Sequence, residues 1–338
     1  MRFWLPLLLA EVCCAQTYVI QPSNTTENLR GVSAISLKVA WASGTHGTYL
    51  RTVDGGQTWT SAQVPGAESL DFRDVEAFST DEAYLLAAGP GDQSRIYKTR
   101  NGGKTWTLQF TNPEPKGFYD CMAFWDLTHG IAVGDPVNGK FELISTNDGE
   151  QWKPLAPATL PPSVEGEGAF AASGSCITVR GDSNVWFATG GKAARVFRSS
   201  DRGKTWTVAE TPIAHGADSS GIFSIFFGDA EHGVIAGGDY QHPDQQGSNL
   251  AYADDGGATW KLAPIQPQPF LSAVGFMDPS SAHGLLAVGS AHAAFASDIA
   301  QQKWQVFLDS NLNALSFAPP RDAWAVGPKG MIVHWSLE

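Results

Sequence analysis

Charged side chains are scarce in this sequence, at 17% of 338 residues, while glycine and proline are plentiful at 36 and 20. A chain so rich in turn-forming residues is poorly suited to a helical bundle. It is not a disordered chain either, because 43% hydrophobic residues can bury a sizeable core. The length allows one large domain or two ordinary ones.

Basic residues are in particularly short supply. Lysine and arginine total 22 against 34 aspartates and glutamates, which gives a formal net charge of −12. A surface this acidic repels phosphate groups. We therefore expect neither general binding to nucleic acid nor docking on anionic lipid.

No apolar run is long enough to span a membrane. The run from Phe3 to Ala10 follows a single positive charge and is typical of a short secretory signal, with cleavage before Gln16. We predict a signal peptide over residues 1–15 and export to the periplasm or the extracellular space. A lipid anchor through Cys13 or Cys14 and a wrongly assigned start codon are the alternatives.

Only four cysteines are present, and cleavage would leave Cys121 and Cys176. The two form either one disulfide, as export permits, or two buried thiols. There is no Cys-x-x-Cys pair, and three histidines share one repeat position, which favours a turn role over metal binding. We expect no metal and no cofactor. The three histidines are His129, His232 and His283.

Tryptophan is abundant, with twelve residues, and six of them end an eight-residue motif that begins with Ser or Thr in most copies. An Asp or Asn in the motif can accept hydrogen bonds from a turn, Gly supplies a positive-φ position, and Trp begins the next strand. The copies span residues 52–59, 99–106, 145–152, 199–206 and 253–260, with a decayed sixth at 297–304. The predicted turn and packing residues are Asp54, Trp59, Asn101, Trp106, Asn147, Trp152, Asp201, Trp206, Asp255 and Trp260.

Three strand-like segments precede each motif and one follows it, so each repeat contains four strands. Repeats of this length and strand content are typical of β-propeller blades. The seventh unit lacks a fourth strand, which residues 16–19 can supply to close the ring. We predict an all-β, seven-bladed propeller over residues 16–338, acting as a monomer. Its first strands are expected near residues 33, 75, 121, 170, 223, 272 and 313.

The repeated motif is similar to the Asp-box, or BNR repeat, of sialidase-like propellers. The whole mature chain resembles the photosystem II stability/assembly factor family and its bacterial relatives. That resemblance implies a lumenal, non-catalytic chaperone that binds a nascent reaction-centre protein through a basic surface patch. In this sequence the basic residues are scattered.

Propellers place ligands at the central funnel, where first strands begin and the loops between second and third strands converge. Asp135 and Tyr240 come from such loops, and residues 237–244 form an insertion that we favour for ligand contact. Axial salt bridges and turn caps are the structural alternative for these residues. The predicted funnel residues are Arg30, Arg73, Tyr119, Asp120, Glu165, Glu167, Arg180, Asp239 and His242.

Two functions remain. The favoured one is non-catalytic binding of a protein or glycan ligand, as an assembly-factor-like scaffold. The alternative is a secreted glycoside hydrolase, sialidase-like or endo-glucanase-like, with Asp120 and Glu167 as its catalytic candidates. A sialidase needs three arginines around a carboxylate, and Arg30, Arg73 and Arg180 could fill those positions. No sialidase motif beyond the Asp-box is present.

Overall fold

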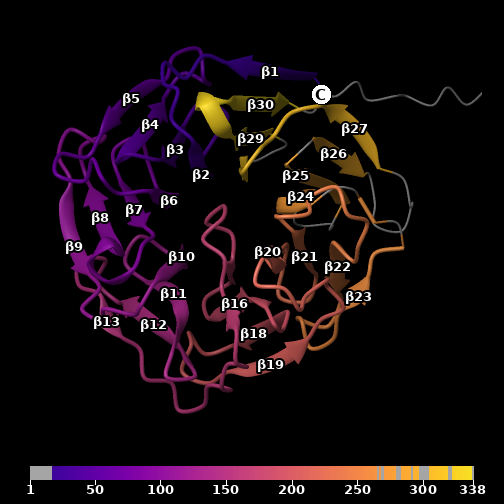
Figure 1. Ribbon diagram of the computed structural model, residues 1–338. Helices are drawn as coiled ribbons and strands as arrows, with labels where there is room; N and C mark the ends of the chain where they lie inside the picture. The colour runs from indigo at the N-terminus through magenta and orange to yellow at the C-terminus, as the bar shows by residue number, and fades with distance from the viewer. Residues whose placement is uncertain are drawn as a thin grey trace, which may run out of the picture.

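The computed structural model describes residues 17–264, 266–267, 270–278, 283–290, 292–296, 304–318 and 322–336. Seven antiparallel sheets of at least four strands surround a central channel, as the all-β prediction requires (Figure 1). Within these ranges the only helical segments are the short 3-10 turns Gly91–Gln93 and Pro328–Gly330. The predicted signal peptide lies outside the described residues.

Each blade runs from an innermost strand at the channel to an outer strand at the rim. Blade 1 consists of β2 (Leu29–Ala34), β3 (Ala40–Gly44), β4 (Thr48–Thr52) and β5 (Thr60–Gln63). Blade 2 consists of β6 (Phe72–Ala77), β7 (Ala83–Ala87), β8 (Arg95–Thr99) and β9 (Thr107–Thr111). Blade 3 consists of β10 (Tyr119–Phe124), β11 (Gly130–Val137), β12 (Lys140–Thr146) and β13 (Lys153–Pro154). Blade 4 consists of β15 (Ile177–Arg180), β16 (Asn184–Ala188), β18 (Arg195–Ser199) and β19 (Thr207–Glu210). Blade 5 consists of β20 (Ser220–Phe227), β21 (Gly233–Asp239), β22 (Leu250–Ala253) and β23 (Lys261–Leu262). Blade 6 consists of β24 (Leu271–Asp278), β25 (His283–Gly289), β26 (Ala293–Ala296) and β27 (Gln305–Leu308). Blade 7 consists of β28 (Ala314–Ala318), β29 (Asp322–Val326), β30 (Ile332–Ser336) and β1 (Thr17–Gln21).

The first strand of blade 4 is not near residue 170, as the sequence suggested, but at β15. Phe170 instead lies in a loop, where its ring stacks on Phe223 at 4.0 Å between centroids. The chain before it forms β14 (Glu167–Gly168), which pairs with β17 (Gly190–Gly191) and extends the sheet of blade 5. The apolar run around Phe170 therefore packs against other rings rather than in a strand.

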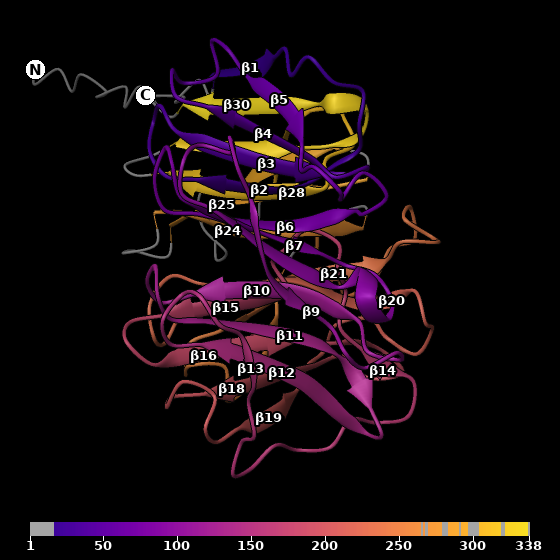
Figure 2. The same cartoon turned by 90° about the vertical axis from the view of Figure 1, so that its left-hand side faces the viewer.

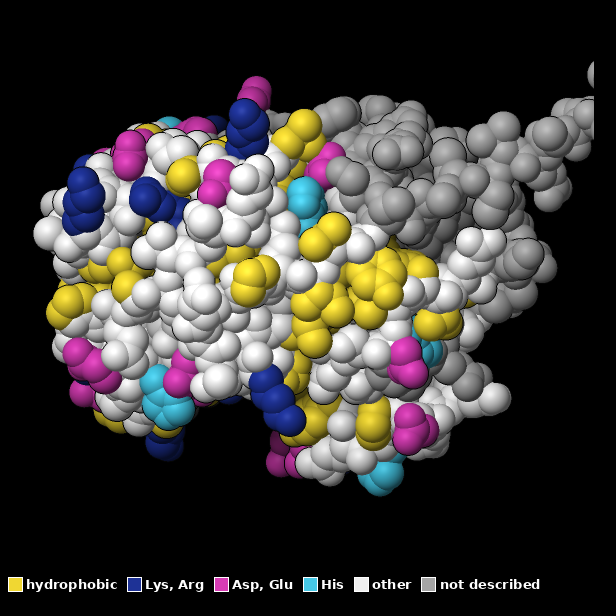
Figure 3. All heavy atoms as spheres, turned by 90° about the horizontal axis from the view of Figure 1, so that it is seen from above, with side chains coloured by type: hydrophobic (Ala, Val, Ile, Leu, Met, Phe, Trp, Pro, Cys, Tyr) yellow, Lys and Arg dark blue, Asp and Glu magenta, His cyan; other side chains and the backbone are white. Residues whose placement is uncertain are grey.

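The N-terminal strand β1 lies at the outer edge of blade 7, antiparallel to β30, so the first and last strands are side by side (Figure 2). Gln21 links this strand to blade 1 and to the second strand of its own blade. Its Oε1 accepts hydrogen bonds from the indoles of Trp59 (2.9 Å) and Trp324 (3.4 Å). The rim above β1 carries hydrophobic side chains among a few charged ones (Figure 3), and Val19 is 60% exposed.

Seven clusters of buried side chains lie between neighbouring blades. Tryptophans of the second strands are central to them, since Trp41 and Trp324 are wholly buried. Motif tryptophans such as Trp59 and Trp206 are also buried, each at 3% exposure. Most of the tryptophans therefore hold the ring together and are not available to a ligand.

The motif turns use their acidic residue as an acceptor. Asp54 Oδ1 accepts the Thr58 backbone N–H at 2.9 Å and the Thr52 hydroxyl at 2.8 Å, and Asp201 and Asp255 each accept the corresponding threonine N–H. In the third copy the acceptor is Asp148 and not Asn147. This turn is one residue shorter, so the position two residues after its Thr146 falls on Asp148. Residues 297–303 of the sixth copy lie outside the described residues.

Candidate functional site

Apart from β20, which pairs with β17, each innermost strand has one edge facing the channel, where its N–H groups have no neighbour within the sheet. Side chains of the adjacent blade satisfy several of them. Ser316 Oγ accepts the Ala34 N–H at 2.9 Å, Ser33 Oγ accepts the Ala77 N–H at 3.1 Å, and Asp74 Oδ2 accepts the Met122 N–H at 2.8 Å. These bonds explain why polar residues lie on the channel wall.

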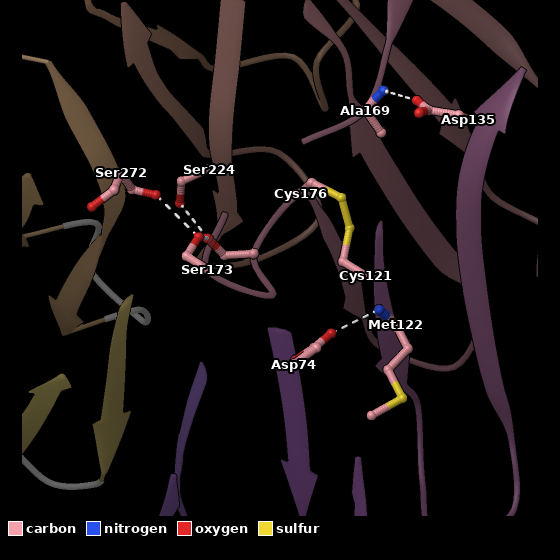
Figure 4. The surroundings of a disulfide bond; sticks show 10 residues. Asp74, Cys121, Met122, Asp135, Ala169, Ser173, Cys176, Ser224 and Ser272 are labelled. Atoms are coloured by element: carbon pink, nitrogen blue, oxygen red, sulfur yellow. Dashed lines mark hydrogen bonds between the residues drawn. A yellow bond between two sulfur atoms is a disulfide. The ribbon is translucent and has the colours of Figure 1, made fainter. Parts of the chain in front are cut away.

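Residues 169–176, which we call the axial loop, cross the channel between β14 and β15 (Figure 4). The loop bonds to blades on opposite sides. Ala171 O accepts Arg73 Nη1 of blade 2 at 2.9 Å, and Ser173 Oγ donates to Ser272 O of blade 6 at 3.0 Å. The loop thereby divides the channel into an upper cavity of about 600 Å³, where innermost strands begin, and a lower cavity of about 640 Å³, where they end.

The end of the axial loop is covalently anchored. Cys176 forms a disulfide with Cys121 on β10, across a sequence separation of 55 residues (Figure 4). Both cysteines are wholly buried. Of the two alternatives that the sequence left open for these cysteines, the structure contains the disulfide.

Two arginines line the upper cavity. Arg73 is held by Ala171 O and lies 3.6 Å from Asp71. Within the described part of the chain, Arg30 has neither an ion pair nor a side-chain hydrogen bond, and its Nε is buried without a partner. Burial, aided by the charge of Arg73, lowers the pKa of Arg30 to about 10. Arg30 is therefore a positive charge without a direct ion pair in that part of the chain, although the charge of Asp71 opposes the shift of its pKa.

Two carboxyls, Asp120 and Asp135, line the same cavity. Burial raises the pKa of Asp135 to about 6, although its Oδ1 accepts the Ala169 N–H at 3.0 Å. Burial and the charge of Asp135 raise the pKa of Asp120 well above its usual range, while a bond from the Ala171 N–H opposes the shift. Asp135 thus holds the axial loop, whereas Asp120 Oδ2 is buried without a hydrogen-bond partner among the described residues.

The remaining wall of the upper cavity is aromatic. Phe223 is at its centre, stacked on Phe170 and edge-on to Phe270 at 4.7 Å. Tyr240, from the favoured insertion, also lines the cavity and is 49% exposed. An apolar wall beside charged donors is the usual composition of a binding pocket.

The structure separates the other predicted funnel residues from this cavity. Glu167 is buried in an ion pair with Arg195, Tyr119 belongs to the core between blades 2 and 3, and Glu165 is exposed. Asp239 and His242 pair with each other at 2.9 Å on the surface insertion. Arg180 lines the lower cavity, at the opposite end of the channel from Arg30 and Arg73. The three arginines that a sialidase needs are therefore not assembled.

The repeated histidines serve turns. His129 donates its backbone N–H to Asp126 and His232 donates its own to Asp229, and each ring Nδ1 also bonds to the same carboxylate. The side chain of His283 lies outside the described residues. Across the described ranges, no group of three or more His, Cys, Asp or Glu side chains has the arrangement of a metal site. No helix in those ranges could cross a membrane.

The channel carboxyls predict a pH dependence of folding. Burial raises the pKa of Asp74 to about 7, above the ordinary value of about 3.9 for an unfolded chain. The folded state then binds more protons than the unfolded state between these values, so stability falls as pH rises from about 4 to about 7. Asp74→Asn keeps an oxygen for the Met122 N–H but cannot ionise. We expect urea denaturation at several pH values to give a flatter slope for this variant.

Glu165→Gln, at an exposed carboxyl, is the matched control and should keep the wild-type slope. Glu76 beside Asp74 is also raised in pKa by burial, so some slope remains in Asp74→Asn. Identical slopes for Asp74→Asn and the wild type would contradict this prediction.

The comparisons with known proteins fit this fold. No protein-family model matches the sequence. The photosystem II assembly lipoprotein Ycf48 of Synechococcus sp. (strain CC9902) is 24% identical over 247 residues, and a xyloglucanase of Paenibacillus sp. is 25% identical over 246. These alignments cover 72% and 68% of this chain, but only 64% and 21% of the relatives.

Three solved structures share the fold over nearly their whole length. Ycf48 bound to a D1 peptide has a TM-score of 0.66 at 17% identity, covering 96% of this chain and 97% of the other. Ycf48 from Cyanidioschyzon merolae has a TM-score of 0.67 at 18% identity, covering 94% of this chain and 98% of the other. A streptogramin B lyase has a TM-score of 0.67 at 13% identity, covering 96% of this chain and 98% of the other. The chain is thus a seven-bladed propeller similar to the photosystem II assembly factors.

Proposed function

We propose that this chain is an exported, non-catalytic propeller that binds a segment of a partner protein in its upper cavity. The observation that carries this proposal is that Arg30, whose Nε has no hydrogen-bond partner among the described residues, lines the same cavity as the aromatic side chains around Phe223. An extended segment with an acidic group beside an apolar side chain matches both features. The cavity, at about 600 Å³, has room for a few side chains.

The comparisons support a protein partner. A relative of similar fold is described as bound to a D1 peptide, and a second as a photosystem II assembly lipoprotein. Export is supported by the apolar run at the N-terminus and by the disulfide, which persists in oxidising compartments. A glycan is the alternative ligand, because aromatic rings also stack on sugars.

One observation favours a second function, a glycoside hydrolase. Asp120 and Asp135 line one cavity and both have raised pKa values, and a xyloglucanase is among the relatives. The binding function has more support because Asp135, one of the two carboxyls, already accepts the Ala169 N–H of the axial loop. Hydrolysis of a glycoside panel that Asp120→Asn abolishes would favour the enzyme.

The binding function predicts a clear effect of Arg30. Peptides selected from a displayed random library should bind the wild type, and Arg30→Gln should weaken them by about tenfold or more, since bonds to charged groups contribute about 1.5–3 kcal/mol. Fluorescence anisotropy with labelled peptides measures this. Arg100→Gln removes the same charge from an exposed position on the outer part of blade 2 and should bind normally. Failure to select any peptide, or equal binding by Arg30→Gln, would contradict the proposal.

A further inference from the structure

The lower cavity is a second space in the channel, distinct from the upper one. The axial loop separates the two, and the lower cavity is lined by the ends of innermost strands from blades 1, 2, 4, 5, 6 and 7. Its volume of about 640 Å³ is in the range of small-molecule sites. Residues at strand ends on a rigid sheet are held more precisely than residues on loops.

Arg180 supplies the positive charge of this cavity. Its guanidinium lies 4.7 Å from the centre of the Phe226 ring, and its Nη1 donates to the Val179 carbonyl at 3.0 Å. Among the described residues it forms no ion pair. Burial lowers its pKa, and the charges of Glu76 and Asp229 oppose this shift. The remaining N–H groups of the fork are therefore available to a ligand.

Glu76 faces the same cavity, and no described residue forms a hydrogen bond with its carboxyl. Burial and the charge of Asp74 raise its pKa well above the usual range, and the charge of Arg180 opposes this shift. A protonated Glu76 is neutral and can donate a hydrogen bond. With Glu76 neutral, Asp229 is the one remaining acidic group whose charge raises the pKa of Arg180 among the described residues.

The rest of the wall is divided between hydroxyls and rings. Ser33 and Ser316 already accept backbone N–H groups, so each hydroxyl hydrogen remains free to donate. The ring centre of Phe317 lies 5.8 Å from that of Phe226, and Phe317 also lines the cavity. A planar anion would find bidentate bonds at Arg180, and an attached ring would find an aromatic surface at Phe317.

We propose that the lower cavity binds a small organic carboxylate with an aromatic body, held by Arg180 and packed against Phe317. A fork that binds two oxygens in one plane suits a carboxylate better than a spherical anion. The site is separate from the protein-binding site proposed for the upper cavity, so either can be present without the other.

Phenylacetate is the probe, and phenylacetamide is its neutral counterpart of the same shape. On the wild-type chain, ligand-observed NMR titration should show phenylacetate binding at least about tenfold more tightly than phenylacetamide, because the amide cannot pair with the guanidinium. Arg180→Gln should weaken phenylacetate by a similar factor. Arg100→Gln makes the same change of charge at an exposed position and should leave its affinity unchanged.

Arg180→Lys keeps the charge without the planar fork, and we expect intermediate affinity from it. This variant replaces Arg180→Gln if the latter fails to unfold cooperatively. The proposal is overturned if the wild type binds no phenylacetate, if the amide binds equally well, or if binding is unchanged in the folded Arg180 variants. The last result would place the probe elsewhere, including the upper cavity.

Discussion

Glu167→Ala should destabilise the chain by about 3–5 kcal/mol, the range measured when one partner of a buried ion pair is removed. The Glu167 side chain has no exposed surface, and that of Arg195 is 8% exposed. The carboxylate accepts the Arg195 Nε–H at 2.9 Å and a second N–H of the same guanidinium. It also accepts the Thr189 hydroxyl at 2.6 Å and the Val164 N–H at 2.8 Å. Alanine would leave the Arg195 Nε–H and the Val164 N–H without an acceptor. Urea denaturation measures the loss.

Glu165→Ala is the matched control, since this glutamate lies two residues away and is exposed. It should change stability by less than about 0.5 kcal/mol. The double variant Glu167→Leu with Arg195→Met removes both charges and should recover part of the loss. If Glu167→Ala instead leaves stability unchanged and removes a glycosidase activity, Glu167 is catalytic and our structural assignment is wrong.

Removing the disulfide should have the second largest effect. The double variant Cys121→Ala, Cys176→Ala frees a closed segment of 55 residues in the unfolded chain, which costs about 2–4 kcal/mol of stability. The axial loop also loses its anchor beside β15. We therefore expect faster amide exchange at Ile225, whose N–H is bonded to the Ser175 carbonyl at 2.8 Å.

Hydrogen exchange with mass spectrometry, together with urea denaturation, checks both parts. The wild type under reducing conditions is a control that needs no substitution, and it should resemble the double variant. Should stability and exchange at the axial loop both match the oxidised wild type, the disulfide would have no role in holding the loop.

The propeller could be predicted from sequence because its turns repeat a chemical requirement. Each needs an acceptor for backbone N–H groups, a glycine and a strand-starting tryptophan, so the period shows directly in the residues. The same logic failed at Asn147, where a turn one residue shorter moved the acceptor to Asp148. A repeat predicts which kind of residue a turn needs, but it does not reveal that one copy of the turn is shorter by one residue.

The site was harder to predict because it depends on where strands begin. The apolar run around Phe170 resembles a first strand, and this placed Arg180 after it, near the upper end of the channel. With the strand at β15, Arg180 ends the strand and faces the lower cavity. The bond between Glu167 and Arg195 joins residues 28 positions apart and follows no period. Arg30, Arg73 and Asp120 were placed at the upper cavity by the repeat alone.

The pairing of β1 with β30 has a consequence for how the chain reaches this structure. β1 is the first of the described strands to be synthesised, and its neighbour β30 is the last of them. The two pair antiparallel, with Thr17 opposite Ser336. Until β30 has been synthesised, β1 has no strand to join, and Gln21 cannot bond to the indole of Trp324 before β29 has been made. Bringing such distant segments together carries a large loop-closure entropy and slows folding. Completion of the ring is therefore a late event, and any growing chain must keep an unpaired, largely apolar edge apart from other chains.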